Sequence, residues 1–597
     1  MPVYAAPLRE YRFLLREVLE IERYSNLPGF SDATPELIDQ ILDEAGRFAS
    51  EVIQPLNVVG DREGCTRSAD GAVKAPTGFK DAYKQLVDGG WPALSCDPAY
   101  GGQGLPRVLN LCFSEMMSGA NMAFAMYPGL SHGAYSALTH HGSDALKAKY
   151  LPKLVSGEWT GTMNLTEPHC GTDLGLLRTK AEPQSDGSYK ITGQKIFISA
   201  GEHDLADNII HLVLARIEGA PAGTRGISLF VAPKFLVGDD GKLGARNGVV
   251  CGKIEEKMGI HGNATCVLNY EGAVGWLVGD ENKGLNAMFT MMNEARLGVG
   301  VQGLSQSEAA YQNGVAYAKD RLQGRALTGA KFADKPADPI IVHPDVRRML
   351  MDAKSFNEAA RAFALWMGLL GDLIAQSPDE AVRQKSEDYM ALMTPVLKSY
   401  LTDKGFENAV NAQQIYGGHG FIEETGVAQF VRDARIAMIY EGANGIQALD
   451  LVGRKLAQNG GRAVFAFFAE IDAFIAENEA NGDLKTYLDA LKISKAQLQE
   501  GTQWLMANAM SNFENAGAAS HDYLGLFGVT ALAYMWARMA KAALHAKANG
   551  GASDPFYDTK LATGRYYAER VVPEAGAYLA KLKAGAAAMM ALPAEAF

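Results

Sequence analysis

Met163-Asn-Leu-Thr-Glu-Pro-His-Cys-Gly-Thr-Asp173 stands where the chain changes from a helical to a strand-like pattern. Before it, apolar residues recur at helical spacing, as in Leu37, Ile38, Ile41, Leu42 and Ala45. After it, short alternating runs such as Lys195-Ile-Phe-Ile-Ser199 are separated by Gly, Asp and Pro, which is typical of strands. The sequence therefore predicts a helical domain followed by an antiparallel β domain.

The helical spacing returns after the strand-like region. Long helical segments are predicted near residues 285–319, 345–371 and 387–415. The fold class is accordingly α+β, with a helical N-terminal domain, an antiparallel β middle domain, a helical bundle and an extra helical domain at the C-terminal end. We expect five parts: a leader over 1–34, a helical domain over 35–161, a β domain over 162–280, a helical bundle over 281–456 and a helical extension over 457–597.

Composition and charge describe a multidomain globular protein. The 597 residues are 48% hydrophobic and 21% charged, which provides large cores. The net charge of −12 argues against nucleic acid as a partner, because phosphate binding depends on basic patches. The extension, with 12 basic and 14 acidic residues, is not a basic arm either.

The six cysteines are scattered, with no CxxC pair, so neither a disulfide framework nor a metal site is predicted. The N-terminus has no basic segment followed by an apolar core, as an export signal requires, and we expect a cytoplasmic protein. The uncharged run Tyr523–Ala537 is shorter than the roughly 18 to 20 residues of a spanning helix. It predicts a buried helix, with attachment to a membrane surface as the alternative.

Glu441 is a lone carboxylate after an apolar run and before the flexible segment Gly442-Ala-Asn-Gly445. A carboxylate held among Ile439, Tyr440 and Ile446 would lose water, which raises its pKa toward the range where a base can exchange protons near neutrality. Taken alone, a solvated or helix-capping glutamate is the commoner interpretation.

Polar groups also gather at the change from helical to strand-like pattern. The hydroxyls of Thr166 and Thr172 lie at a chain reversal, and crevices between domains are common ligand sites. Lys195–Ser199 can present an aromatic face and a hydroxyl toward the same crevice. A simple capped turn is the alternative for the first segment.

Four ordered motifs carry a resemblance to a known family. They are Thr-Glu-Pro with Gly-Thr-Asp (166–173), Gly-Gln-Lys-Ile-Phe-Ile-Ser (193–199), Gln-Ile-Tyr-Gly-Gly-His-Gly-Phe (414–421) and Ile-Tyr-Glu-Gly (439–442). In this order they resemble the acyl-CoA dehydrogenases over roughly residues 35–456. The leader and the extension look like those of a larger bacterial subgroup. The resemblance implies an FAD-dependent enzyme with Glu441 as catalytic base.

The same resemblance implies residues for the cofactor and the substrate. Leu165, Thr166, Phe197 and Ser199 match contacts to the flavin ring, while Gln414–Gly418 match a loop that holds the adenosine and pyrophosphate from a neighbouring subunit. The full cofactor set implied is Met163, Leu165, Thr166, Phe197, Ile198, Ser199, Arg321, His343, Gln414, Ile415, Tyr416, Gly417, Gly418, Ala443 and Gly445. The substrate positions implied are Thr172, Arg296 and Gly442.

The chain departs from the family pattern at three places. Arg321-Leu-Gln-Gly-Arg325 stands where the family commonly has Arg-x-x-Phe-Gly-Lys, so one aromatic cofactor contact is missing. Ala443-Asn-Gly445 replaces Thr-Ser-Gln after the base, and Phe197 replaces a frequent Trp. We therefore expect altered cofactor contacts at these positions.

Some relatives carry the base on the first long helix after the β domain, immediately before the residue that matches Arg296. That position is Ala295 here, and Glu294 is one residue away, which turns it by about 100° around a helix. Glu441 is therefore the predicted base.

The resemblance implies α,β-dehydrogenation of an acyl-CoA thioester, with electrons passed to an electron-transferring flavoprotein. We expect a short acyl chain, with 3-(methylthio)propanoyl-CoA as the first candidate, and a homodimer. Two alternatives stay open: an acyl-CoA oxidase, in which oxygen reoxidises the flavin, and a flavin-holding alkylation-response protein that binds DNA through its C-terminal domain.

Overall fold

The computed structural model describes residues 2–509 and 511–597. Their contacts divide the chain into two compact units. One unit is formed by residues 45–298 and the other by residues 1–44 together with 299–597. The chain passes between the units within two helices, α2 (Pro35–Phe48) and α7 (Gly284–Asp320).

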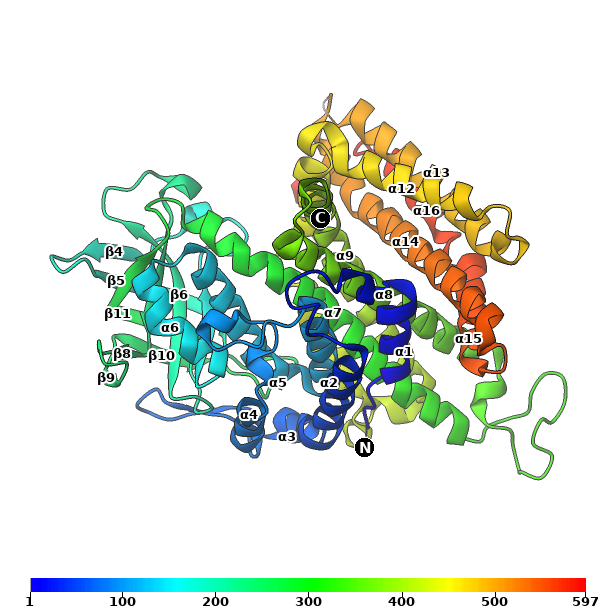
Figure 1. The fold of residues 1–597 in the computed structure, drawn as a ribbon, viewed down its shortest axis with the longest axis horizontal. Helices are drawn as coiled ribbons and strands as arrows, with labels where there is room; N and C mark the ends of the chain where they lie inside the picture. Colours follow the sequence, from blue (N-terminus) through cyan, green and yellow to red (C-terminus); the bar gives the residue numbers. More distant parts are fainter. Residues whose placement is uncertain (1, 510) are drawn as a thin grey trace. The chain divides into compact units, whose positions relative to one another are not determined.

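The unit of residues 45–298 combines helices with a β-sheet (Figure 1). Its longest complete helix, α5, bends at Asn121, whose backbone angles are not helical. The helix α6 begins at an N-cap, where the Ser143 hydroxyl accepts the N–H of Leu146. The helices that lie wholly in this unit are α3 (Pro55–Glu63), α4 (Phe79–Asp88), α5 (Arg107–His141) and α6 (Asp144–Ser156).

A seven-stranded sheet forms the β part of this unit, in the order β10-β11-β5-β4-β6-β3, with β7 pairing with both β11 and β6. Most neighbours are antiparallel, but β3 and β4 each pair with β6 in parallel. The strands of the sheet are β3 (Trp159–Asn164), β4 (Lys180–Pro183), β5 (Tyr189–Ser199), β6 (Asn208–Ile217), β7 (Ser228–Pro233), β10 (Val249–Ile254) and β11 (Thr265–Val278). Two small ribbons are made by β1 (Thr66–Arg67) with β2 (Val73–Lys74) and by β8 (Phe235–Val237) with β9 (Leu243–Arg246).

Long helices make up the other unit. The helix α8 begins with Pro344 at its first position, where a missing N–H costs nothing, and α9 begins at an Asp379 cap. The leader is not a loose tail, because Tyr11, Phe13, Leu14 and Leu15 are each 0% exposed. The helices of the leader and bundle are α1 (Leu8–Phe13), α8 (Pro344–Gln376), α9 (Glu380–Ile415), α10 (Val427–Arg435) and α11 (Asn444–Asp450).

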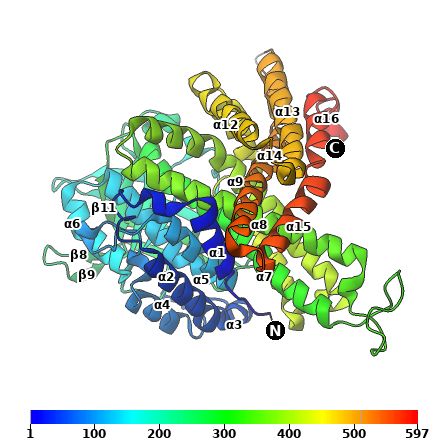
Figure 2. The ribbon, with the colours of Figure 1, turned by 45° about the vertical axis from the view of Figure 1, so that its right-hand side comes forward.

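The C-terminal extension adds helices that run side by side (Figure 2). They are α12 (Arg462–Asn478), α13 (Lys485–Asn508), α14 (Phe513–Ala546), α15 (Pro555–Tyr566) and α16 (Glu574–Lys583). The central helix α14 contacts α13 and α16 within the extension and α8, α9 and α11 of the bundle. Its run Tyr523–Ala537 is buried throughout, as predicted. Within the described residues, no helix has the length and apolar character needed to cross a membrane.

The predicted α+β fold class is confirmed, with one refinement. The sheet is mixed rather than wholly antiparallel, because β3 and β6 are joined by a long excursion through β4 and β5 that lets them run in the same direction. The six cysteines of the chain are all free thiols.

Candidate active site

Glu441 lies in a strained turn. Its backbone φ is +58°, and Gly442 after it has φ +86°. The left-handed region costs a residue with a side chain on the order of 1–2 kcal/mol, and such strain persists only where the surrounding structure holds it. The turn separates the 3₁₀ helix η11 (Ile436–Met438) from α11. The structure around the turn must therefore hold the Glu441 backbone in this conformation.

Two buried polar side chains fix this turn. Lys398 of α9 donates from Nζ to the Gly442 carbonyl at 2.9 Å. Gln447 donates from Nε2 to the carbonyls of Glu441 and Gly442, both at 3.2 Å. Lys398 and Gln447 are each 0% exposed, so these bonds form away from water, where an unmade bond is costly. Sequence reasoning missed both residues, and the one available signal was a lysine within the apolar run Val396–Leu401.

Asn444 joins the same turn to α9. Its Nδ2 donates to the Thr402 hydroxyl at 3.0 Å and to Asp403 at 2.7 Å, while its Oδ1 accepts from Lys398 at 2.8 Å. The side chain is buried, and sequence reasoning missed it. Asn444 thus has an internal structural role in the segment where family members usually carry polar residues. Its neighbours Ala443 and Gly445, both predicted cofactor contacts, are half-buried and exposed respectively.

The expected apolar enclosure of Glu441 is not found. Ile439 is 50% exposed and the Glu441 side chain is half-buried. Ile439 follows the end of η11, so helical spacing no longer directs it to the core. Tyr440 is more tightly held, because its hydroxyl donates to Gln302. Burial, together with the Glu441 charge, raises the pKa of Tyr440, which keeps it a neutral donor.

Glu294 is bound to a neighbouring helix of the unit of residues 45–298. Its carboxylate accepts the Ser136 hydroxyl of α5 at 2.7 Å and lies 3.3 Å from the guanidinium of Arg107. Both contacts are to Oε1, and the buried Oε2 has no hydrogen-bond partner among the described residues. This arrangement favours a structural role for Glu294.

In the same unit, the segment that follows β3 lies along β5. Ile196 donates its N–H to the Thr166 carbonyl at 2.9 Å. The structure therefore brings the predicted positions Leu165 and Thr166 next to the strand that carries Phe197 and Ser199. Met163 lies in β3, and Ile198 is 2% exposed, so its side chain belongs to the core.

Phe197 combines strain with exposure. Its φ is +59° and its side chain is 60% exposed. The pairing of β5 with β11 shifts register here, between the Ile198–Cys266 and Lys195–Leu268 pairs. An exposed aromatic ring on a strained bulge has no packing explanation, and bulges often redirect a side chain next to active sites. Its open face suits stacking against a flat ring.

A buried ion pair between Lys195 and Glu167 joins β5, just before Phe197, to the segment that follows β3. Lys195 Nζ lies 2.9 Å from Glu167 and donates to the Leu165 carbonyl at 2.9 Å. Glu167 also accepts from the hydroxyl and N–H of Thr179 and from the N–H of Arg178. Burial lowers the pKa of Lys195 to about 8, with the Glu167 charge acting against it. Sequence reasoning quoted both residues within motifs but assigned them no role.

Glu167, His169 and Cys170 place one possible metal-ligand atom each within 4.8 Å of one another. The Glu167 oxygens, however, already accept the bonds just described, and His169 Nε2 donates to the Leu176 carbonyl at 2.9 Å. A metal would have to displace these partners. The cluster is explained without one, and the expectation of no metal site stays a prediction.

Arg321 and His343 lie in one loop region of the unit that includes residues 299–597. Leu322 pairs with Pro339, and Ile340 donates its N–H to the Arg321 carbonyl at 2.8 Å. His343 Nε2 lies 2.8 Å from the Gln323 carbonyl, so this nitrogen carries a proton and is engaged. Arg321 is exposed.

The predicted segment Gln414–Gly418 covers the end of α9. Tyr416 stacks on Tyr317 with ring centroids 4.1 Å apart, and Tyr317 accepts the N–H of Arg321 at its carbonyl. The segment and Arg321 therefore share one region of the unit. Gly417 has φ +58°, and nothing lies within 4 Å of a Cβ added there or at Gly418, so an outside partner can approach the backbone. Gln414 is exposed, whereas Ile415 is buried.

The predicted substrate positions are less uniform. Thr172 is exposed and Gly442 lies in the turn of Glu441. Arg296 is 7% exposed, with its guanidinium 5.9 Å from the Phe289 ring centroid. Thr172 is therefore accessible to solvent, whereas the Arg296 side chain is buried.

Comparison with known proteins gives matches along most of the chain. Family profiles match in the order acyl-CoA dehydrogenase N-terminal domain over 35–158, middle domain over 162–273, C-terminal domain over 282–456, and acetyl-CoA dehydrogenase C-terminal like over 467–593. Fold and profiles define an FAD-dependent oxidoreductase. The chain belongs to the acyl-CoA dehydrogenase family.

The matches to individual proteins cover nearly the whole chain. A 3-methylmercaptopropionyl-CoA dehydrogenase of Ruegeria pomeroyi is 43% identical over 575 residues, 96% of this chain and 97% of that protein. A broad-specificity linear acyl-CoA dehydrogenase of Mycobacterium tuberculosis is 34% identical, over 96% of each chain. The fold also matches the structure of a Bacillus anthracis acyl-CoA dehydrogenase complexed with FAD, with a TM-score of 0.73, 21% identity and coverage of 92% and 88%.

Proposed function

We propose that this acyl-CoA dehydrogenase oxidises a short acyl-CoA thioester to the 2-enoyl-CoA, with Glu441 as the base that removes the α-proton. The observation that carries the proposal is the strained backbone of Glu441 in a turn fixed by buried Lys398 and Gln447. A base at a set position lowers the entropic part of the barrier.

The residues present fit FAD. In one unit, Phe197 offers an exposed ring on a strained bulge, and Thr166 and Ser199 offer polar groups beside it. In the other, the open backbone of Gly417 and Gly418 would serve the adenosine and pyrophosphate end of an FAD held by a neighbouring subunit, and Arg321 would serve as a further flavin contact. When bound, FAD supplies the oxidant that accepts two electrons from the substrate.

Glu441 then has two tasks in the proposed reaction. Its carboxylate accepts the α-proton, and its backbone N–H donates to the thioester oxygen as negative charge develops there. The hydrogen bonds of Lys398 and Gln447 to the turn keep the Glu441 carboxylate and backbone N–H in fixed positions relative to each other. Tyr440, kept protonated beside the carboxylate, does not compete for the α-proton.

For the substrate, support comes from the similar proteins. The Ruegeria relative is named for 3-methylmercaptopropionyl-CoA, and a Syntrophomonas wolfei relative, 34% identical over the whole chain, is named a butyryl-CoA dehydrogenase. We place 3-(methylthio)propanoyl-CoA first and butyryl-CoA second. Anaerobic titration of the yellow protein with a panel of acyl-CoAs tests the proposal: short acyl-CoAs should bleach the flavin, with the methylthio substrate acting at the lowest concentration. Bleaching only by long-chain acyl-CoAs would contradict it.

The electron acceptor proposed is an electron-transferring flavoprotein. The alternative hypothesis, an acyl-CoA oxidase, predicts that oxygen is consumed and hydrogen peroxide is produced at the rate of turnover. The DNA-binding alternative has little support, because the extension matches an acetyl-CoA dehydrogenase-like profile and carries slightly more acid than base.

We further propose a cytoplasmic homodimer. The helix α14 contacts α8 and α9, so the extension covers bundle surface that would otherwise be open to further copies. Light scattering should give a mass of about 128 kDa, twice the 64.1 kDa of one chain.

A further inference from the structure

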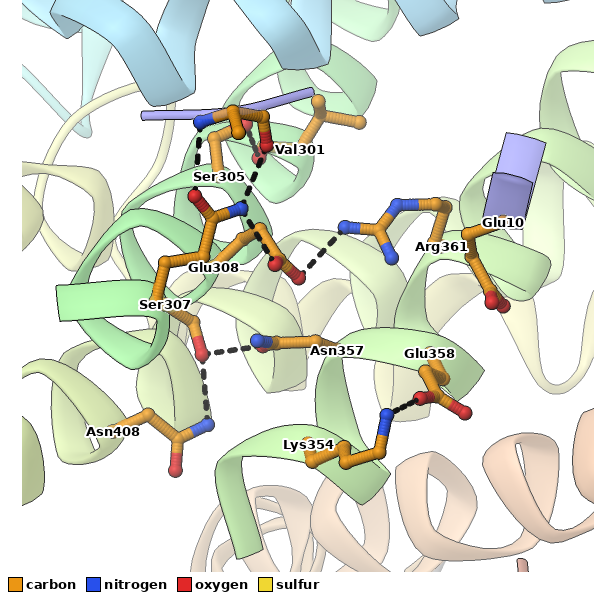
Figure 3. Close-up of polar contacts among 12 residues, drawn as sticks. Glu10, Val301, Ser305, Ser307, Glu308, Lys354, Asn357, Glu358, Arg361 and Asn408 are labelled. Carbon is orange, nitrogen blue, oxygen red and sulfur yellow. Dashed lines mark hydrogen bonds and ion pairs between the residues drawn. The ribbon is translucent and has the colours of Figure 1, made fainter. Parts of the chain in front are cut away.

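A cavity of about 540 Å³, with both charged and apolar side chains in its walls, lies within the unit that contains the leader and the bundle. Its walls are leader residues 6–10 and Arg12, Glu308 and Tyr311 of α7, four residues of α8, and Phe556 of α15. The α8 residues are Lys354, Asn357, Glu358 and Arg361. Figure 3 shows part of this wall, with side chains from α1, α7 and α8: Glu10, Glu308, Lys354, Asn357, Glu358 and Arg361.

The acidic groups of the cavity already have partners. Glu10 accepts Lys560 at both oxygens, at 2.6 and 2.5 Å. Glu358 is paired with Lys354 and, at 2.7 Å, with Lys560. Glu308 accepts Arg361 at 2.9 Å on one oxygen and Gln312 at 3.0 Å on the other. No carboxylate of the wall is left with an empty oxygen.

Donors, in contrast, are left over. Asn357 is 1% exposed; its Oδ1 accepts the Ser307 hydroxyl, but its Nδ2 has no partner among the described residues. The Tyr311 hydroxyl likewise has no hydrogen bond within the described part of the chain, and burial raises its pKa to about 12, so it stays a donor. Lys354 has three N–H groups and, among the described residues, bonds Glu358; its side chain is 25% exposed. Of these donors, Asn357 Nδ2 is the buried one, and a buried donor without a partner is costly, which points to an absent acceptor.

We propose that this cavity binds a small oxyanion, a short-chain carboxylate or inorganic phosphate, through Lys354, Asn357 and Tyr311. The surplus of donors over acceptors selects a ligand that offers several acceptor oxygens, and the buried Arg361 adds positive charge nearby. A cation would meet only carboxylates that are already paired. The cavity is larger than such a ligand, so water can accompany it, and the occupant would lie between the leader and the helices α7 and α8.

Isothermal titration calorimetry of the flavin-loaded full chain, at constant ionic strength, tests the proposal. The probes are succinate, inorganic phosphate and the neutral analogue succinamide. We expect one saturable site for at least one oxyanion and none for succinamide. Whichever oxyanion binds more tightly identifies the source. Lys354→Met and Tyr311→Phe should each weaken binding at least tenfold.

Arg16→Gln is the matched control, because Arg16 is a leader cation that pairs with Asp39 and does not line the cavity. It should leave the affinity unchanged. The flavin spectrum and the heat-unfolding midpoint of each variant show whether it has folded, and Tyr311→Phe removes a single oxygen atom. Absence of saturable binding in the parent protein, equal binding of succinamide, or oxyanion binding that both cavity variants retain would overturn the proposal.

Discussion

At the scale of single residues, buried polar groups carry the arrangement of both predicted site regions. Lys195 and Glu167 support the segment before Phe197, and Lys398 supports the turn of Glu441. Such groups are conditionally favourable: paired they fix a conformation, and alone they are costly. Removing one partner of such a pair should therefore lower the stability of the protein more than removing both partners.

Lys195→Met should destabilise the protein strongly, because it leaves the 3% exposed Glu167 without its cation. Breaking a buried pair at one side typically costs about 3–5 kcal/mol. Urea unfolding followed by tryptophan fluorescence should show a lower midpoint for Lys195→Met than for the double variant Lys195→Met/Glu167→Met. Equal midpoints for the single and double variants would contradict the proposed role of the pair.

Two buried histidines make the β part of the structure sensitive to acid. Burial, together with the nearby Lys234 charge, lowers the pKa of His203 and of His211 from 6.5 to about 3. Between pH 6.5 and about 3 the unfolded chain binds more protons at these positions than the folded chain, so stability falls as the pH falls.

The expected slope is about 1.4 kcal/mol per pH unit for each histidine. Urea midpoints between pH 7 and 4 measure it, and His211→Asn should reduce the slope relative to the parent. A slope that this substitution leaves unchanged would show that His211 does not contribute.

At the scale of elements, the sequence predicted regular helices and strands well. The expected helices near 285–319, 345–371 and 387–415 correspond to α7, α8 and α9, and the quoted strand Lys195–Ser199 lies in β5. Hydrophobic periodicity carries this information locally. The parallel pairing of β3 with β6 could not be predicted, since it depends on segments more than 40 residues apart.

The candidate site was predicted less completely than the helices. Motifs identified Glu441 and Phe197, but the left-handed backbone of both residues and the supporting roles of Lys398 and Asn444 arise from tertiary contacts. A lysine in an apolar run does not reveal which carbonyl it will reach. The exposed Ile439 shows the converse error, because apolar character alone predicted burial.

Lys398→Met tests the role of α9 in placing the turn. We expect kcat to fall by about 10- to 100-fold with flavin content retained, since a displaced base loses reactivity while cofactor contacts elsewhere persist. Lys385→Met is the matched control, because Lys385 lies on the same helix, is 54% exposed and pairs with Glu470. Steady-state kinetics and the flavin absorbance ratio check both variants. Unchanged kcat in Lys398→Met would remove this residue from the account.

At the scale of the whole chain, the leader, bundle and extension of one unit share a buried junction. Lys560 of α15 bridges Glu10 of the leader and Glu358 of α8, and all three are buried. Segments far apart in sequence therefore depend on one cation. The predicted leader of residues 1–34 gave no sign of this junction, because Glu10 and Lys560 are 550 residues apart.

Lys560→Met should loosen the leader, because it leaves two acids buried without their shared partner. Limited proteolysis should then cut within the first 34 residues faster than in the parent protein, and the heat-unfolding midpoint should fall. Lys541→Met, at a 42% exposed lysine of the same extension, serves as control. Equal cleavage rates for parent and Lys560→Met would contradict the shared junction.

Anaerobic stopped-flow mixing with 3-(methylthio)propanoyl-CoA tests whether Glu441 is the base. Glu441→Gln should retain FAD and bind the thioester yet lose nearly all flavin bleaching, whereas Glu294→Gln, altered at the carboxylate held by Ser136 and Arg107, should bleach like the parent protein. Full bleaching in Glu441→Gln, or its loss in Glu294→Gln alone, would contradict the account.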